Sequence, residues 1–269
     1  MSQLEGKTAL ITGGASGIGR LLGRRLLEEG VSQLVIWDVQ QHALNATVSE
    51  LRRGEHHVEG ACVDLADPNS IRAEAEKLAA AGIAIDLLVN NAGVLIGKSF
   101  VDHSFDDIRR TLEVNTAAPL YATSVFLPSM LERKNGHIVN IASAAGLVSS
   151  PGMSVYCASK SAILGWADSL RLEMERDNTG VRVTTVAPYY INTSMVTGVR
   201  SPVIPILKAD HVVERIISAV RADQISLRLP WLVNFVPLLK GLLPTRWFDL
   251  IVGRWLGIYR TMEHFKGRS

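Results

Sequence analysis

The segment KTALITGGASGIG, residues 7–19, decides the fold of this chain. It starts as a short apolar run, Lys7 to Thr12, passes through a glycine-rich turn and enters a helical pattern with leucines at positions 21, 22, 26 and 27. Glycines let a backbone approach a pyrophosphate closely, and a helix amino terminus offers free N–H groups and the positive end of its dipole. The segment predicts strand, phosphate-binding turn and helix, although a tight βα connection without a ligand can have the same pattern.

The next predicted strand, Gln33 to Trp37, ends at an acid. Asp38 follows Gly19 by nineteen residues, near the distance at which a carboxylate meets the adenosine ribose hydroxyls. Its charge would repel a 2′-phosphate, and neither Ser16 nor Val39 supplies the arginine or lysine that would attract one. The pattern favours NAD over NADP; the alternative is an acidic turn residue.

Strand and helix patterns alternate along the rest of the chain. Further strands are predicted at 58–63, 85–89, 138–142 and 181–186, and helices over Phe105 to Leu131 and around Tyr156. This alternation predicts an α/β fold: a doubly wound, Rossmann-type parallel sheet in one domain, with helices on both faces and ligands beyond the strand carboxyl ends. Two strand ends carry side chains suited to a dinucleotide, namely Asp64 and Leu65 after the third strand and Asn91, Ala92 and Gly93 after the fourth.

The stretch Tyr156-Cys157-Ala158-Ser159-Lys160 combines a phenol and an ammonium at a helical interval of four residues, which brings them onto one helix face. A nearby cation favours the phenolate and lowers the pKa of the tyrosine. Ser143 follows the apolar run 137–142, where a strand end would present its hydroxyl. Tyr156 then acts on a substrate proton and Ser143 holds the substrate oxygen; by itself, the Tyr-Lys interval also occurs by chance.

Together, these motifs resemble the short-chain dehydrogenase/reductase family over nearly the whole chain. The resemblance is carried by Thr12-Gly13-x-x-x-Gly17-Ile18-Gly19, Asn90-Asn91-Ala92-Gly93, Asn115, Ser143 and Tyr156-x-x-x-Lys160, in the order and spacing of the family.

The resemblance implies a catalytic tetrad of Asn115, Ser143, Tyr156 and Lys160. Tyr156 is the acid/base, Ser143 polarises the substrate oxygen, and Lys160 lowers the tyrosine pKa and binds the nicotinamide ribose. Asn115 holds a helix bend and a water of a proton relay; the alternative is an ordinary helix amide. The implied NAD-binding residues are Gly13, Ser16, Gly17, Ile18, Gly19, Asp38, Asp64, Leu65, Asn91, Ala92, Gly93, Tyr156, Lys160 and Thr193.

One departure from the family pattern lies after the sixth strand. Many members have Pro-Gly there, whereas this chain has Pro188-Tyr189-Tyr190, which predicts a narrower or aromatic substrate side. The later segments Leu242-Leu243-Pro244 and Trp255-Leu256-Gly257-Ile258 are similar to the retinol and 17β-hydroxysteroid dehydrogenase-like branch, which includes epidermal-type retinol dehydrogenases. The expected substrate is a lipophilic alcohol or carbonyl of retinoid, steroid or long-chain type.

Composition excludes several other classes of protein. The chain is 47% hydrophobic and 20% charged with a net charge of +2, which is typical of a globular domain rather than a disordered or nucleic-acid-binding one. Cys62 and Cys157 cannot build a disulfide framework, and the adjacent His56 and His57 lack metal-ligand spacing, so no metal is expected. With neither a basic nor an apolar leader before Lys7, we expect a cytoplasmic protein, peripheral at most at a membrane surface.

Residues 229–269 form an expected C-terminal amphipathic extension to the catalytic unit, residues 1–228. From Arg228 onward there are seven Lys or Arg and two Asp or Glu, a net charge of +5, interleaved with aromatic residues. Such a segment can cover an apolar pocket, lie on a membrane or pack against a partner subunit, and the family resemblance implies dimers or tetramers built on the helices at Phe105 and Tyr156. A dinucleotide-binding redox sensor or scaffold is the rival function, and the complete tetrad disfavours it.

Overall fold

A seven-stranded parallel sheet forms the centre of the computed structural model, which describes residues 3–52, 56–201 and 203–267. The strands lie in the order β3-β2-β1-β4-β5-β6-β7. Their bounds are β1 Thr8–Thr12, β2 Gln33–Asp38, β3 His57–Cys62, β4 Leu87–Asn90, β5 Gly136–Ile141, β6 Val181–Pro188 and β7 Ser226–Leu229. The order reverses between β1 and β4, so that the carboxyl ends of these two strands open a crevice for ligands.

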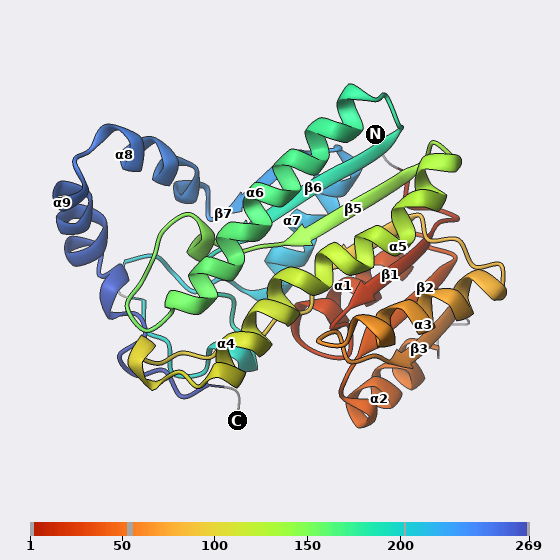
Figure 1. Ribbon diagram of the computed structural model, residues 1–269, viewed down its shortest axis with the longest axis horizontal. Helices are drawn as coiled ribbons and strands as arrows, with labels where there is room; N and C mark the ends of the chain where they lie inside the picture. The colour runs from red at the N-terminus through yellow and green to blue at the C-terminus, as the bar shows by residue number, and fades with distance from the viewer. Residues whose placement is uncertain (1–2, 53–55, 202, 268–269) are drawn as a thin grey trace.

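Helices cover both faces of the sheet (Figure 1). Leucine and valine side chains of α1 (Gly17–Glu28), α2 (Gln41–Arg52) and α7 (Ala209–Arg221) pack on one face, and those of α3 (Pro68–Ala80), α5 (Ala118–Glu132) and α6 (Ser154–Arg176) pack on the other. Because both faces are covered, the central strands are almost wholly buried, and their side chains form continuous apolar runs such as Ala9 to Ile11. The predicted doubly wound fold is confirmed.

Three elements differ from the sequence prediction. The expected single helix over Phe105 to Leu131 is interrupted: α4 (Phe105–Leu112) passes into a π-helical turn, Glu113–Ala117, before α5 begins. The last strand, β7, and the helix α7 before it were not predicted. β7 is short, and the sequence SLRL, in which half-buried and buried residues alternate, resembles an ordinary loop or helix end at that length.

The segment after β7 leaves the body of the molecule and returns to it. The short helices α8 (Val236–Leu242) and α9 (Thr245–Phe248) make a lobe at the left of Figure 1, from which the chain runs back toward α4. A second π-helical turn, Asp249–Trp255, and a 3₁₀ turn, Ile258–Arg260, complete this segment. Within the described ranges, no helix combines the length and apolarity needed to cross a bilayer.

Candidate active site

A cavity of about 250 Å³ opens at the carboxyl ends of the strands. It is lined by every residue that the sequence predicted for cofactor binding, and by three members of the predicted tetrad, Ser143, Tyr156 and Lys160. Asn115, the fourth member, is fully buried behind this lining. Positions spread from Gly13 to Thr193 in the chain are thus brought to one site.

The glycine turn after β1 fits a phosphate cradle because side chains have no room in it. Gly13 and Gly17 have positive φ angles of 65° and 55°, a region that favours glycine. A Cβ atom at Gly13 would lie 2.8 Å from Cα of Ala92. Since α1 starts at Gly17, the unpaired N–H groups of its first turn face the same cavity, which suits an anionic group such as a pyrophosphate.

Thr12 and Asn91 lock the loop after β4 to the glycine turn. The Thr12 hydroxyl accepts hydrogen bonds from the backbone N–H groups of Asn91 and Ala92, at 3.1 and 3.2 Å. The Asn91 amide donates to the backbone oxygens of Thr12 and Gly13, at 2.9 and 3.0 Å. The two loops at the switch in strand order are therefore one hydrogen-bonded unit.

Asp38 lies at the end of β2 and lines the cavity, with 8% of its surface exposed. Its carboxylate accepts hydrogen bonds from the backbone N–H groups of Ala15, at 3.1 Å, and Gln40, at 3.0 Å. The carboxylate therefore also fastens the glycine turn to β2. Asp64, whose carboxylate accepts from Ala66 N at 3.0 Å, lines the same end of the cavity together with Leu65.

Ser143 and Tyr156 meet at the opposite end of the cavity. Ser143 follows β5, its Oγ accepts a hydrogen bond from Ala145 N at 3.1 Å and donates to the backbone oxygen of Pro188 at 3.5 Å, and its side chain is near enough to the Tyr156 phenol to affect the pKa of that phenol. Lys160 lies one turn further along α6, with its Nζ 2.9 Å from the backbone oxygen of Ile141, to which it donates. The end of β5 thus supplies Ser143, and one face of α6 supplies Tyr156 and Lys160, which are three of the four residues of the predicted tetrad.

The pKa of Tyr156 differs from the prediction. Burial raises the pKa of Tyr156 to about 12, and the hydrogen bond with Ser143 opposes this rise. The predicted net lowering is therefore wrong for the protein chain as it stands, because burial outweighs the effect of a nearby cation; burial also lowers the pKa of Lys160, to about 8. Both charged forms lose solvation, and the phenol remains protonated at neutral pH.

Asn115 lies in the π-helical turn between α4 and α5, and its side chain is hydrogen-bonded on both sides. Its amide nitrogen donates to the backbone oxygen of Val94, at 2.9 Å, and to Ser159 Oγ, at 3.1 Å, while its oxygen accepts from Val94 N at 2.8 Å. It thus ties the helix bend to the loop after β4 and to α6, which carries Tyr156. Single-turn π-bulges of this kind often mark functional sites.

The substrate end of the cavity has aromatic residues, as predicted from Tyr189 and Tyr190. Their rings meet edge to face, with centroids 4.7 Å apart and planes at 73°. Thr193 also lines the cavity, near Gly17. The sequence analysis missed several lining residues, among them Arg110, Val114, Val148, Ser150, Met153 and Ile258. Except for Ile258, which belongs to the segment Trp255-Leu256-Gly257-Ile258, they belong to no motif, and their residue types alone do not indicate that they line a cavity.

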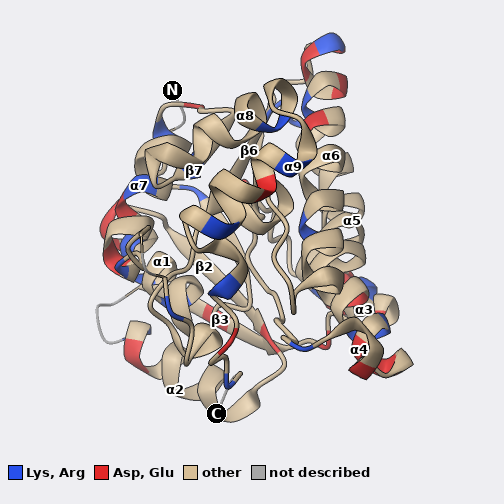
Figure 2. Ribbon diagram, turned by 90° about the vertical axis from the view of Figure 1, so that its left-hand side faces the viewer, with Lys and Arg blue, Asp and Glu red and all other residues tan. Residues whose placement is uncertain are grey.

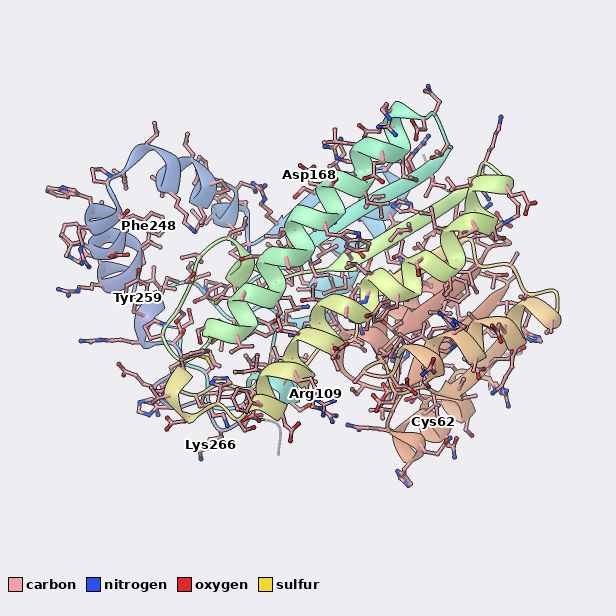
Figure 3. All side chains as sticks on the ribbon, in the orientation of Figure 1. Cys62, Arg109, Asp168, Phe248, Tyr259 and Lys266 are labelled. Atoms are coloured by element: carbon pink, nitrogen blue, oxygen red, sulfur yellow. The ribbon has the colours of Figure 1, made fainter. Side chains whose placement is uncertain are left out.

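The C-terminal segment forms part of the cavity wall. Ile258 lines the cavity, and buried Thr261 hydrogen-bonds the Tyr190 phenol, with 3.0 Å between the oxygens. A Cβ atom at Gly97, in the loop after β4, would lie 2.5 Å from Cε of Met262. Figure 3 follows this segment from Phe248 and Tyr259 in the lobe to Lys266, which lies back near α4. The segment closes the substrate end rather than hanging free of it.

The sequence of the chain matches a known protein family and several known dehydrogenases. Residues 7–203 match the family described as short chain dehydrogenase. Epidermal retinol dehydrogenase 2 of Mus musculus is 34% identical, over 99% of this chain and 87% of its own length, and Short-chain dehydrogenase/reductase 3 of Homo sapiens is 35% identical, over 100% and 89%. Estradiol 17-beta-dehydrogenase 11 of Homo sapiens is 33% identical, over 92% and 83%.

Solved structures agree with these sequence relatives. A short-chain dehydrogenase/reductase from Burkholderia phymatum in complex with NAD superposes with a TM-score of 0.82 and 27% identity, covering 94% of this chain and 97% of that one. A short-chain dehydrogenase from Sphingobium yanoikuyae in complex with NADPH gives a TM-score of 0.77 at 27% identity, covering 93% and 94%. The neighbours thus include both phosphorylation states of the dinucleotide.

Proposed function

Because this chain belongs to the short-chain dehydrogenase family and is an oxidoreductase, we propose that it interconverts a lipophilic secondary or allylic alcohol and its carbonyl with NAD. The observation that carries the proposal is that Ser143, Tyr156 and Lys160 line the same cavity as the glycine turn. A dinucleotide-binding sensor without turnover would have no use for a buried phenol, hydroxyl and amine gathered at one end of the cavity.

Each member of the tetrad has a proposed task. In the reducing direction the Tyr156 phenol gives its proton to the substrate oxygen, and in the oxidising direction the phenolate takes it back. Ser143 holds and polarises that oxygen. Lys160, as an ammonium, stabilises the phenolate that forms, and Asn115 fixes α6 relative to the loop after β4.

A nicotinamide dinucleotide, when bound, supplies or accepts the hydride. The first turn of α1 and Gly13 are proposed to hold its pyrophosphate, Asp38 its adenosine ribose, and Lys160 and Thr193 its nicotinamide half. Asp38 favours NAD, since a buried carboxylate already bonded to two backbone N–H groups cannot readily turn away from a 2′-phosphate.

The proposed substrate is of retinoid, steroid or long-chain type. Support comes from apolar side chains at the substrate end, among them Val148, Met153 and Ile258, and from the retinol and estradiol in the names of the relatives. Apolar lining with a few polar groups favours substrates that are largely hydrocarbon.

We also propose that the extension, residues 229–269, makes a peripheral membrane contact. Trp231, Trp247 and Trp255 are 66%, 60% and 72% exposed, far more than core aromatic residues. In the ribbon of Figure 2, several basic positions and few acidic ones are coloured near α8 and α9. Exposed tryptophans beside basic side chains suit an anionic lipid surface. Subunit packing is the other use of such a surface.

Oligomers of two or four chains are proposed to form through the outer faces of α4, α5 and α6. Phe105, Tyr121 and Leu172 on these helices are 93%, 40% and 52% exposed. Sedimentation of the purified protein, alone and with Phe105→Asp, tests this contact.

A screen of NADH formation against secondary and allylic alcohols of increasing size tests the activity, with NADH consumption against the matching carbonyls. We expect turnover that improves with the apolar bulk of the substrate. A protein that binds NAD but turns over no member of either panel would contradict the proposal and favour the sensor.

A further inference from the structure

Tyr190 stands at the substrate end of the cavity with its single hydroxyl proton already committed. Its phenol oxygen lies 3.0 Å from Thr261 Oγ1 and 3.5 Å from Met153 Sδ. Thr261 Oγ1 in turn donates to the backbone oxygen of Ile258, at 2.9 Å. Since each hydroxyl has one proton and Thr261 gives its own to Ile258, the Tyr190 proton goes to Thr261 Oγ1 or to Met153 Sδ, and in either case a lone pair of the phenol oxygen remains available to accept.

Packing holds Tyr190 in this arrangement. Thr261 is fully buried, so its hydroxyl has no water to turn to, and the Tyr189 ring lies edge-on against the Tyr190 ring. Burial raises the pKa of Tyr190 strongly, so the phenol stays neutral. The oxygen is therefore a fixed, uncharged acceptor.

Ser150, a second hydroxyl in the cavity lining, has the same property. It is 7% exposed, and its Oγ donates to the backbone oxygen of Ile258 at 3.1 Å, the same oxygen that receives the proton of Thr261. Two lining hydroxyls, on loops after β5 and β6, thus point their protons into the C-terminal segment. The hydroxyls of Tyr190 and Ser150 form the polar part of an otherwise apolar wall of the cavity. Both oxygens can accept hydrogen bonds from a ligand, and neither hydroxyl has a free proton to donate.

We infer that this wall is a subsite for a hydrogen-bond donor, a second hydroxyl on the substrate remote from the reacting carbon, with Tyr190 as the residue that selects it. The inference rests on the proposed function and adds to it the substrate class, a lipophilic diol or hydroxy ketone. A substrate with a carbonyl or ether oxygen at the same place would bring a second acceptor against the Tyr190 oxygen, and the two lone pairs would repel each other. Discrimination against such analogues arises because the acceptor in the wall is left without a partner.

The experiment compares matched ketones in the holoenzyme with NADH. One series carries a hydroxyl at increasing distances from the carbonyl, and a second series has the same compounds with that hydroxyl capped as a methyl ether. We expect at least one position at which kcat/KM is about 10-fold higher for the hydroxyl compound than for its ether. Equal kcat/KM at every position would overturn the inference while leaving the oxidoreductase proposal intact.

Two sets of variants assign the preference to Tyr190. In Tyr190→Phe the ratio of kcat/KM for hydroxyl over ether falls to about 1, because the acceptor is gone. The control, Tyr259→Phe, removes a phenol that donates to Asp249 in the lobe and does not line the cavity, so the ratio stays. An unchanged ratio in Tyr190→Phe would overturn the assignment.

Variants of Thr261 change the ratio of kcat/KM for hydroxyl over ether through the hydrogen bond, and a loss of packing alone would not change this ratio. Thr261→Val frees the Tyr190 proton to turn into the cavity, so the ether is accepted better and the ratio falls, whereas Thr261→Ser keeps the hydroxyl and the ratio. A ratio that stays the same in Thr261→Val contradicts the proton count. If no ketone is turned over, the proposed function fails, and calorimetric binding of the same pairs to the NAD-loaded protein decides the donor subsite separately: hydroxyl preference supports it and equal binding overturns it.

Discussion

Nζ of Lys160 lies 5.9 Å from the centroid of the Tyr156 ring and donates its hydrogen bond to the backbone oxygen of Ile141. The ammonium thus stands near the phenol while being held by the strand end. Burial lowers the pKa of Lys160 to about 8 and raises that of Tyr156 to about 12, so at neutral pH the amine is charged and the phenol protonated. In this state Tyr156 can donate a proton, and Lys160 can stabilise the anion left behind.

The pH dependence of carbonyl reduction follows from this pair. We expect kcat/KM to be level below about pH 8 and to fall above it, because Lys160 loses the charge that stabilises the phenolate. Lys160→Met has lower activity and no such fall. Initial rates from pH 6 to 10 check this, and a bend near pH 8 that survives in Lys160→Met would assign it to another group.

Replacing Tyr156 by phenylalanine removes the transferred proton and little else. We expect turnover to drop by about 10²-fold or more, while the Kd for NAD stays within a few-fold. The control is Tyr121→Phe, which removes a phenol from the exposed face of α5. Turnover above roughly a tenth of wild type in Tyr156→Phe would show that another group transfers the proton.

The cofactor assignment rests on Asp38. Asp38→Ser combined with Val39→Arg exchanges a repulsive carboxylate for a phosphate partner, and Val39 is exposed enough to accept the larger side chain. We expect the ratio of kcat/KM for NADP over NAD to rise by about 10-fold or more, the equivalent of ~1.4 kcal/mol.

Asp38 also holds Ala15, so a second variant separates charge from loop geometry. Asp38→Asn with Val39→Arg keeps an oxygen for the Ala15 N–H while removing the charge. If neither double variant changes the cofactor ratio, Asp38 does not face the ribose.

The free energy of unfolding is expected to depend on His137, a buried residue of β5. Burial lowers its pKa to about 4, with the charges of Asp223 and Arg182 acting in opposite directions. The unfolded chain takes up this proton near pH 6.5, so the stabilisation is complete above pH 6.5 and is lost as the pH falls through about 4.

Complete loss of this stabilisation lowers the free energy of unfolding by about 3 kcal/mol. Urea unfolding at pH 7 and pH 4.5 measures the difference, and His137→Gln, which keeps a donor for Thr184, reduces it. A pH dependence that is the same in His137→Gln would assign the acid sensitivity to other groups.

The exposed tryptophans provide the test of membrane contact. Trp247→Ser with Trp255→Ser removes apolar area that would enter the lipid, so partition to anionic liposomes falls by about 10-fold or more at ~25 cal/mol per Å². Added salt weakens binding of the wild type. Val101→Ser, at an 88% exposed site after β4, serves as the control. Indifference of the wild type to liposomes would leave subunit packing as the use of this surface.

Sequence motifs were most informative where chemistry restricts the residue type. Gly13 and Gly17 need positive φ angles, and Tyr156 and Lys160 need a helical interval, so each leaves a pattern that can be read without a structure. The parallel sheet followed from the alternation of apolar runs, because a strand buried on both faces has little choice of residue.

What the sequence did not indicate depends on long-range packing. The π-helical turn at Asn115 forms because the amide binds Val94 and Ser159, which are distant in the chain. The pKa of Tyr156 was predicted with the wrong sign because spacing gives the nearby cation but not the extent of burial. For the C-terminal segment the sequence left three uses open, one of them to cover an apolar pocket; the structure places Ile258 in the cavity lining and Thr261 against Tyr190, contacts that depend on packing between distant parts of the chain.

That closure sets an order of assembly for the molecule. The bonds that complete the substrate end span long stretches of chain, 108 residues from Ser150 to Ile258 and 71 from Tyr190 to Thr261, whereas Asp38 binds Ala15 of the glycine turn across only 23 residues and β1 pairs directly with β2. Long loops close late in folding and open early under stress. We expect a nascent or partly opened molecule to hold its dinucleotide cradle first, so that cofactor capture precedes the ability to select a substrate.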